Sequence, residues 1–342
     1  MNLAQAKTHR NQRGHVLVSS VSSRGYTTLG ASARAEVPLD LTGRLVLVTG
    51  GAGDIGSAVV AACAARGAKV VMVDNGTSVE GHGEDPELVV RRAKALSEEY
   101  GSVEGRHCDV TDPDQVEALV GGLFDEHGNI DVVVTAAGTL RVKPIWETTV
   151  DDWHSVMASH STHTFLVTAA ACRRWRANCL TRNGAWSSLI NFTAATGLVG
   201  RPDLGVGHSA AKAAIAGLTL EVAHEMFQYN VAVNAVAAAN VQGRMMDHVG
   251  AYVADPGSEL DPGSPKHAAN LVSYLASDDA SWITGQVFRV MGGLVGWYHP
   301  WHVQASLEKQ STWTLEDLRL GMRRLLGVYP EYKAIQGKHR EF

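Results

Sequence analysis

The sequence predicts an α/β protein with a doubly wound parallel sheet of about seven strands, in the order 3-2-1-4-5-6-7, and helices on both faces. Short apolar runs, such as residues 45–48 and 130–135, have the length of buried strands. Longer segments with apolar residues at helical spacing alternate with these runs. A glycine-rich turn, residues 49–53, joins the first run to its helix. This alternation is typical of parallel strands joined by crossover helices.

The composition excludes several classes of protein. The 342 residues carry a net charge of −5, which gives no reason to expect binding to nucleic acid. No apolar run reaches the length of a membrane helix. The four cysteines lack the spacing of a metal site, and reduced thiols in a reducing compartment are the simplest interpretation. We therefore expect an ordinary globular protein.

The first 40 residues differ from the rest of the chain. Before Glu36 they hold no acidic residue, while basic residues and serines recur. This suits a transit peptide, and residues 24–27 resemble a matrix-protease cleavage site. A disordered extension is the alternative, because the segment has little helical amphipathicity. We expect a globular domain over residues 41–296 and a cytoplasmic location, or the mitochondrial matrix if residues 1–26 are a transit peptide.

The first strand and its turn carry the most informative motif. Residues 45–56 read LVLVTGGAGDIG, a strand, a glycine turn and the start of a helix. Glycine lets the backbone approach a pyrophosphate, and the free N–H groups at the start of a helix face an anion. The motif predicts a Rossmann-type dinucleotide site, with Gly50, Gly53 and Gly56 against the pyrophosphate. A glycine-rich turn without a nucleotide is the alternative.

Acidic residues follow the next two strands. The second strand, residues 68–73, ends at Asp74, 24 positions after Gly50. An acid there can accept hydrogen bonds from both ribose hydroxyls of NAD and repels the 2′-phosphate of NADP. NAD(H) is therefore the expected cofactor, with NADP(H) less favoured. Asp109 ends the third strand, residues 105–109, where it can reach an adenine ring.

The later elements continue the alternation. Strands are predicted over residues 130–135, 188–193, 231–236 and 285–290, and long helices over 153–171 and 209–226. Residues 240–265 are rich in glycine and proline and follow the sixth strand, which predicts a lid over the ligand crevice. Residues 297–342 form a basic, aromatic tail that we expect to wrap the core or a neighbouring subunit. Its W-Y-H-P-W-H motif could hold a metal, but no carboxylate accompanies it, so we predict aromatic packing and no metal site.

From about residue 41 to residue 293 the chain resembles the short-chain dehydrogenase/reductase superfamily. The motifs are TGGAGDIG, CDVTD, TAAG, INFTAATG, a lysine on the next helix, and VNA at 233–235. Within that superfamily, residues 137–144 (AAGTLRVKP with Ala136) and the S-H-x-x-x-T-F-L pattern of residues 159–166 are similar to the (3R)-hydroxyacyl-CoA dehydrogenase part of multifunctional enzymes. Residues 264–290 resemble the same group.

The resemblance implies an NAD(H)-dependent oxidoreductase that interconverts a secondary alcohol and a ketone, with a hydroxyacyl or ketoacyl thioester as a candidate substrate. It also implies a homodimer or homotetramer. Asp54 stands where glycine is commoner in the motif. The implied cofactor-binding residues are Thr49, Gly50, Gly53, Asp54, Ile55, Gly56, Asp74, Asp109, Val110, Ala136, Ala137, Gly138 and Lys212.

The catalytic positions depart from the family pattern. Members use a serine, a tyrosine and a lysine, the last two as Tyr-x-x-x-Lys. Here Lys212 is present, but His208 occupies the tyrosine position and Ala194 the serine position. His160 stands where the superfamily generally has asparagine, although a histidine there resembles the norm of the acyl-CoA group.

Two interpretations stay open at this stage. In the first, His208 carries the proton, because an imidazole titrates near neutrality and a neighbouring Lys212 cation keeps it a neutral base, with His160 in a relay. In the second, the protein is a non-redox pseudo-dehydrogenase, either a nucleotide-binding subunit or a lyase or isomerase. A solvent-facing residue at the start of a helix is the plainest interpretation of His208.

Overall fold

A single eight-stranded sheet forms the centre of the computed structural model, which describes residues 18–21, 27–29, 39–180, 184–199, 204–250, 261–299, 303 and 305–327. The strand order is β10-β9-β8-β7-β6-β3-β4-β5. The strands are β3 (Leu45–Thr49), β4 (Lys69–Asp74), β5 (Val103–His107), β6 (Val132–Thr135), β7 (Ser187–Thr193), β8 (Val231–Ala238), β9 (Gln286–Met291) and β10 (Leu294–Tyr298). Strands β3 to β9 are parallel, which confirms the predicted order. Strand β10 is an antiparallel edge strand paired with β9, and it was not predicted from the sequence.

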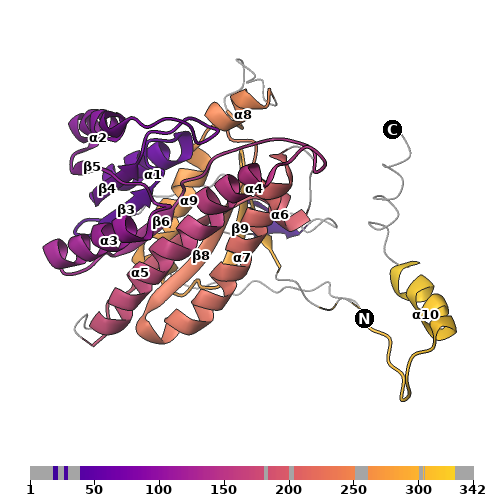
Figure 1. Ribbon diagram of the computed structural model, residues 1–342. Coiled ribbons are helices and arrows are strands. Elements are labelled where there is room, and N and C mark those ends of the chain that lie inside the picture. Colours follow the sequence, from indigo (N-terminus) through magenta and orange to yellow (C-terminus); the bar gives the residue numbers. More distant parts are fainter. Residues whose placement is uncertain are drawn as a thin grey trace.

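Helices cover both faces of the sheet (Figure 1). One face carries α1 (Asp54–Ala64), α2 (Pro86–Tyr100) and α9 (Lys266–Leu275), and the other carries α3 (Pro113–His127), α5 (His163–Asn178) and α7 (Val206–Met226). In β3, Val46 and Val48 pack into the first layer, while Leu45 and Leu47 pack into the second. This two-sided burial explains why the strand is apolar at every position.

The predicted long helix over residues 153–171 is interrupted. It consists of α4 (Val150–Met157), a single π-helical turn (Ala158–Thr162) and α5. Thr149 and Asp152 form a capping box at the start of α4. A π turn inside an α-helix is rare and is found mostly at functional sites, and this one contains His160.

Some element boundaries differ from the predictions. Strand β5 ends at His107, so Asp109 lies in the loop beyond it. Helix α7 begins at Val206, earlier than predicted, which places His208 in its first turn. Short helices α6 (Ala195–Val199) and α8 (Arg244–His248) follow β7 and β8.

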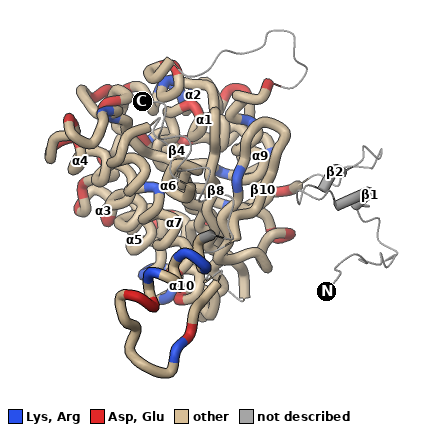
Figure 2. Tube along the Cα trace, turned by 90° about the vertical axis from the view of Figure 1, so that its right-hand side faces the viewer, with Lys and Arg blue, Asp and Glu red and all other residues tan. Residues whose placement is uncertain are grey.

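The terminal segments lie outside the sheet domain. Strands β1 (Val18–Val21) and β2 (Thr27–Leu29) pair antiparallel. Helix α10 (Leu315–Gly327) lies apart from the sheet domain (Figure 1) and carries charges of both signs (Figure 2). The rest of the predicted extension, much of the predicted tail and residues 251–260 of the predicted lid fall outside the described residues. Among the helices that the structure describes, none combines the length and apolar character needed to cross a membrane.

Candidate active site

A cleft of about 500 Å³ lies at the carboxyl ends of the central strands. The glycine turn after β3 forms its floor. Gly50 has a φ of +64°, and a Cβ there would lie 2.5 Å from the backbone of Ala137, so only glycine fits between the two turns. Ala137 belongs to the turn after β6, so the two turns bound the cleft together. This is the crevice at which parallel sheets of this type bind their ligands.

Helix α1 points its N-terminus into the cleft. Its N-cap is Gly53, which has no side chain to bond the first N–H groups. Gly56 lies one turn further on, where a Cβ would approach the carbonyl oxygen of Gly50 to 2.1 Å. The helix therefore begins directly against the glycine turn and presents free N–H groups to an anion.

Asp74 is held at the edge of the cleft by backbone groups. Its Oδ2 accepts a hydrogen bond from the N–H of Ala52 at 3.0 Å, and its Oδ1 accepts one from the N–H of Gly76 at 2.9 Å. An ionised carboxylate has about four acceptor positions, so two remain for a ligand. The arrangement suits recognition of a pair of hydroxyl groups.

Most of the predicted cofactor residues line this cleft. They are Gly50, Gly53, Asp54, Ile55, Gly56, Asp74, Asp109, Val110, Ala136, Ala137 and Gly138. Thr49 does not, because it is fully buried beneath the turn. Its hydroxyl lies 3.0 Å from Nε2 of His163, and His163 therefore supports the turn from below.

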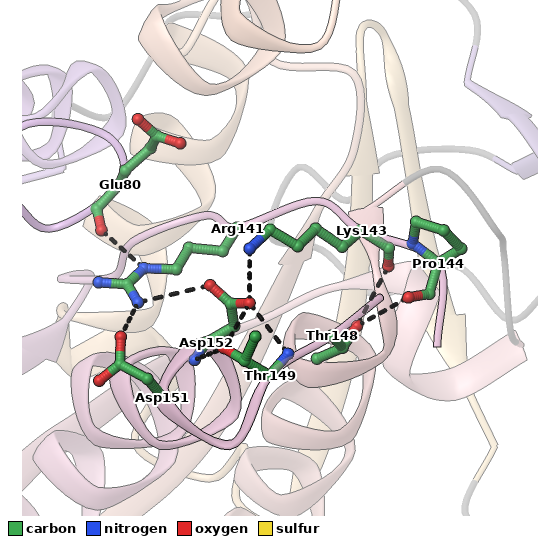
Figure 3. Close-up of polar contacts among 8 residues, drawn as sticks. All are labelled: Glu80, Arg141, Lys143, Pro144, Thr148, Thr149, Asp151 and Asp152. Carbon is green, nitrogen blue, oxygen red and sulfur yellow. Dashed lines mark hydrogen bonds and ion pairs between the residues drawn. The ribbon is translucent and has the colours of Figure 1, made fainter. Parts of the chain in front are cut away.

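The loop after β4 forms one wall of the cleft and is hydrogen-bonded to the loop after β6. The N–H of Leu140 donates to the carbonyl of Val79 at 2.7 Å, and Arg141 donates to the carbonyl of Glu80 (Figure 3). The carboxylate of Asp152 accepts from Lys143 at 2.7 Å and also lies beside Arg141. Lys143 and Thr149 hold the pKa of Asp152 far below its usual range. The pair of loops is thus anchored to the N-terminus of α4.

A second cavity of about 280 Å³ opens beside the cleft. The two share four lining residues, namely Ile55, Ala136, Val241 and Met245. All four residues predicted for catalysis line this second cavity: Ala194, His160, His208 and Lys212. The structure therefore brings together side chains from the π turn, the end of β7 and α7, beside the predicted nucleotide cleft.

His208 is buried and faces the second cavity. Its Nδ1 lies 3.3 Å from the hydroxyl of Thr196, and its ring meets the ring of His160 edge-on, with centroids 5.2 Å apart. Burial, with a further contribution from the charge of Lys212, lowers the pKa of His208 to about 3. The expectation that this imidazole titrates near neutrality is therefore wrong, since it rested on the ordinary pKa of an imidazole. The interpretation of His208 as a solvent-facing residue is also wrong, because the side chain is buried. The expectation that His208 is neutral agrees with the structure.

One ring nitrogen of His160 has a hydrogen-bond partner, and the other has none among the described residues. Its Nε2 lies 2.7 Å from the carbonyl oxygen of Thr139, so this nitrogen carries the proton. Nδ1 is then an acceptor, and it is buried without a partner in the described part of the chain. Burial and the nearby Lys212 charge hold the pKa of His160 well below its usual value. A buried acceptor without a donor indicates a place for a ligand or a water molecule.

Lys212 lies one helical turn after His208 on α7. Its Nζ donates to the carbonyl of Phe192 at 2.7 Å. Burial lowers the pKa of Lys212 to about 7. Lys212 is therefore the group of this cavity that exchanges its proton near neutral pH.

Two residues around these cavities, Thr196 and Arg244, were not predicted from the sequence. Thr196 is the hydroxyl partner of His208, and its position two residues after Ala194 in the INFTAATG motif could have suggested it. The hydroxyl of the neighbouring Thr193 donates to the carbonyl of Lys212 at 2.6 Å. Arg244, in the predicted lid, also lines the cleft, and no local signal in the sequence indicates this.

The buried histidines predict that the folded protein is sensitive to acid. Burial lowers the pKa of His163 to about 4 and that of His208 to about 3, from an ordinary 6.5. Between about pH 3 and 6.5 these two histidines bind more protons in the unfolded chain than in the folded chain, so their contribution to stability is complete above that window and falls as the pH drops through it. At 1.36 kcal/mol per pKa unit, each histidine costs on the order of 3 kcal/mol of unfolding free energy by pH 4. Urea unfolding between pH 7.5 and 4.5 measures this slope.

A matched pair of variants tests whether buried His208 contributes to this pH dependence of the unfolding free energy. His208→Phe removes one buried imidazole, and we expect a shallower dependence of unfolding free energy on pH. His82→Ala removes an exposed histidine and should leave the slope unchanged. Equal slopes in all three proteins would refute the assignment.

Comparison with known proteins identifies the family. The family model described as enoyl-(acyl carrier protein) reductase matches residues 50–295. The chain belongs to the short-chain dehydrogenase/reductase superfamily. The predicted family is thus confirmed, and with it an oxidoreductase of this superfamily on an NAD(P)-binding Rossmann fold.

Individual members of the superfamily support the same assignment. The chain is 30% identical to hydroxyacyl-CoA dehydrogenase ChsB1 of Mycobacterium tuberculosis, over 87% of this chain and 93% of that protein. It is 32% identical to the 3-oxoacyl-[acyl-carrier-protein] reductase of Synechocystis, over 75% of this chain and 98% of that protein. The crystal structure of a short chain dehydrogenase from Mycobacterium avium matches with a TM-score of 0.72 and 31% identity, over 84% of this chain and 96% of that one.

Proposed function

We propose that this protein is an NAD(H)-dependent dehydrogenase that interconverts a secondary alcohol and a ketone, with His208 in place of the superfamily tyrosine. The observation that carries the proposal is the junction of the two cavities. His208, His160 and Lys212 meet at a cavity that opens into the nucleotide cleft, so proton transfer and cofactor chemistry would take place side by side.

The cleft fits a nicotinamide dinucleotide. The turn at Gly50 lacks side chains, the N-terminus of α1 is open, and Asp74 offers free acceptor positions for a ribose. Gly53 and Gly56 would hold the pyrophosphate, Asp109 would face the adenine, and Lys212 would hold the nicotinamide ribose. When bound, the nicotinamide supplies the hydride chemistry at the carbinol carbon.

The preference for NAD(H) over NADP(H) depends on Asp74. We expect Asp74→Asn to raise the Kd for NADH about tenfold, because a hydrogen bond to a charged group is worth roughly 1.5–3 kcal/mol. The Kd for NADPH should fall, because the variant no longer repels the 2′-phosphate. Fluorescence titration with each nucleotide measures the ratio of the Kd for NADH to the Kd for NADPH. Asp114→Asn, on the surface of α3, is the control. A wild-type protein that binds NADPH more tightly than NADH would contradict the role of Asp74.

Thr196 lets His208 serve both directions of the reaction. A hydroxyl can donate or accept, so it can pair with either tautomer of the imidazole. With the proton on Nδ1, the free Nε2 accepts the alcohol proton. With the proton on Nε2, the neutral imidazole donates a hydrogen bond to the carbonyl oxygen of a ketone. The proton that converts the product alkoxide to the alcohol would come from the Lys212 ammonium group, so that His208 is again neutral at the end of the step.

His160 and Lys212 complete the proton path in this proposal. The free Nδ1 of His160 accepts a hydrogen bond from the substrate hydroxyl or from a water molecule. Lys212 takes up the released proton near neutral pH, since its pKa is lowered to about 7. A group with a pKa near the working pH is the most effective proton reservoir.

The apolar lining of the second cavity supports an acyl substrate. Leu140, Phe192, Met246 and Val249 surround the polar groups. Such a wall would bury a hydrocarbon chain, at about 25 cal/mol for each Å² removed from water. The relatives are named as a hydroxyacyl-CoA dehydrogenase and a 3-oxoacyl-[acyl-carrier-protein] reductase. We therefore propose a hydroxyacyl or ketoacyl thioester as the substrate.

The direct test is turnover. We expect the protein to oxidise NADH when given β-ketoacyl thioesters, more readily than when given small ketones, in a spectrophotometric assay. His208→Ala should lower kcat/KM at least about 100-fold, which is the lower end of general acid–base catalysis. His224→Ala, at the exposed end of α7, should have no effect. A protein that binds NADH but turns over only as the Ala194→Ser, His208→Tyr double variant would instead be a decayed dehydrogenase.

We also propose that the protein forms a homodimer or homotetramer through α5 and α7. Phe165 on α5 is a large apolar side chain that is 54% exposed in a single copy of the chain. Packing against the same helices of a second copy would cover it.

A further inference from the structure

An acidic residue lies in the part of the cleft where the anionic diphosphate of a nucleotide would bind. Asp54 is the first residue of α1, and its side chain lines the cleft with Gly50 and Gly53. A carboxylate at this end of a helix is favourable in itself, but it repels a second anion in the same place. The superfamily motif more commonly has glycine at this position. The extra negative charge therefore calls for a compensating cation.

That cation is Arg244, from the short helix α8 in the lid. The backbone N–H of Arg244 donates to Oδ2 of Asp54 at 2.8 Å, and its Nε lies 4.0 Å from the same oxygen. A Cβ on Gly53, the N-cap of α1, would lie 3.8 Å from a terminal guanidinium nitrogen of Arg244. The guanidinium thus lies over the start of α1.

The residue before Arg244 makes this close approach possible. Gly243 has a φ of +154°, and a Cβ there would lie 2.4 Å from Oδ2 of Asp54. Any larger residue would push α8 away from α1. Glycine at 243 and aspartate at 54 together hold this end of the lid against the cofactor turn.

The charges around the cleft show why Arg244 matters. Among the described residues that line it, the carboxylates are Asp54, Asp74, Glu84 and Asp109, and Arg244 is the one lysine or arginine. The side chains of Asp54 and Arg244 are 38% and 44% exposed, so their ion pair contributes little to stability by itself. The guanidinium remains available to a ligand, and its fork of donors matches phosphate oxygens.

We propose that Arg244 is a cofactor-binding residue that pairs with the diphosphate of the dinucleotide, and that Asp54 positions it by holding α8. The proposal rests on the proposed function, because it assumes that the cleft binds NAD(H). It also links the two cavities. Met245 lines both, and Met246 lines the second. The helix that contacts the diphosphate therefore also closes one side of the substrate cavity.

Nucleotide binding with and without phosphate tests the proposal. We expect Arg244→Ala to raise the Kd for NADH between about 10- and 100-fold and to leave the Kd for adenosine unchanged. The Kd of Arg244→Lys for NADH should lie between those of the wild-type protein and Arg244→Ala. The dependence of NADH affinity on salt should also weaken in Arg244→Ala, because one phosphate contact is lost. Arg173→Ala, an exposed arginine on α5, is the matched control.

Asp54→Asn separates the two roles of Asp54. The amide oxygen still accepts from the N–H of Arg244, but the negative charge is gone, so NADH should bind several-fold more tightly. Equal losses of NADH and adenosine binding in Arg244→Ala would show a structural role only and overturn the proposal, as would unchanged NADH binding. A wild-type protein that fails to bind NADH would instead refute the proposed function.

Discussion

Replacing Lys212 with methionine is expected to lower kcat/KM for alcohol oxidation by roughly 10²- to 10⁴-fold, the usual range for loss of a general acid–base group. Methionine keeps the length and apolar stem of lysine, so the cavity stays filled. Among the described residues that line the cavity, it removes the one whose pKa, at about 7, lies near the working pH. It also removes the charge that helps to keep His208 neutral. Steady-state kinetics with NAD⁺ and a hydroxyacyl thioester measure the effect.

The pH profile distinguishes the two contributions of Lys212. In the wild-type protein, kcat/KM for oxidation should rise through about pH 7, because the amine must lose its proton before it can accept the one from the alcohol. For ketone reduction the profile should be reversed. Lys212→Arg retains a cation that never titrates in this range, so it should abolish the inflection without restoring activity.

A surface lysine provides the control for this experiment. Lys94 is exposed on α2, and Lys94→Met should leave both the rate and the profile unchanged. If Lys212→Arg kept the wild-type rate and inflection, the proton reservoir would have to be another group. A Lys212→Met variant with wild-type kcat/KM would remove Lys212 from the mechanism altogether.

The second large effect is expected at the junction of α1 and the glycine turn. In Gly56→Ala the new methyl group would lie 2.1 Å from the carbonyl oxygen of Gly50 and 2.9 Å from the Cα of Gly51. Both contacts are to backbone, which no side-chain rotation relieves, so α1 must move away from the turn. Overpacking of this kind costs about 1–3 kcal/mol. The N–H groups of the α1 N-terminus would move with it, and we expect the Kd for NADH to rise at least about tenfold.

Gly217→Ala provides a matched control for that substitution. Gly217 also lies within a helix, but a Cβ there has no neighbour within 4 Å in the described part of the chain. Alanine is favoured over glycine inside a helix by about 0.5–1 kcal/mol, so this variant should be more stable than the wild-type protein. Urea unfolding and NADH titration of both variants give the comparison. A Gly56→Ala variant that bound NADH as tightly as the wild-type protein would show that α1 does not contact the nucleotide.

The features that the sequence predicted well are encoded locally. Apolar runs predicted the central strands, such as β3, β4 and β6, because residues on both sides of a covered parallel sheet must be apolar. The strand order followed from the doubly wound fold class. The glycine turn and Asp74 were found from their spacing, because a strand, a tight turn and a helix leave few places for these residues. Strand β10 was not predicted because Gly296 interrupts its short apolar run, and Val295 and Trp297 are exposed.

The site chemistry was harder to predict because it depends on contacts across the fold. The identity of His208 was evident, but its pKa was not, since burial beneath other elements moves it well below neutrality. The π turn places the ring of His160 against that of His208. It could not be predicted, because the spacing of apolar residues over 153–171 is that of an ordinary helix. Arg244 lies 190 positions from Asp54, and only folding brings α8 to the start of α1.

The sequence by itself determined the fold, the superfamily and the position of the nucleotide turn, since each rests on residue types at short, fixed spacings. The tertiary structure decided which of the three basic side chains titrates near neutral pH, which hydroxyl supports His208 and which cation faces the cleft. Desolvation and ion pairing depend on neighbours that are distant in the chain, so a linear pattern does not contain them.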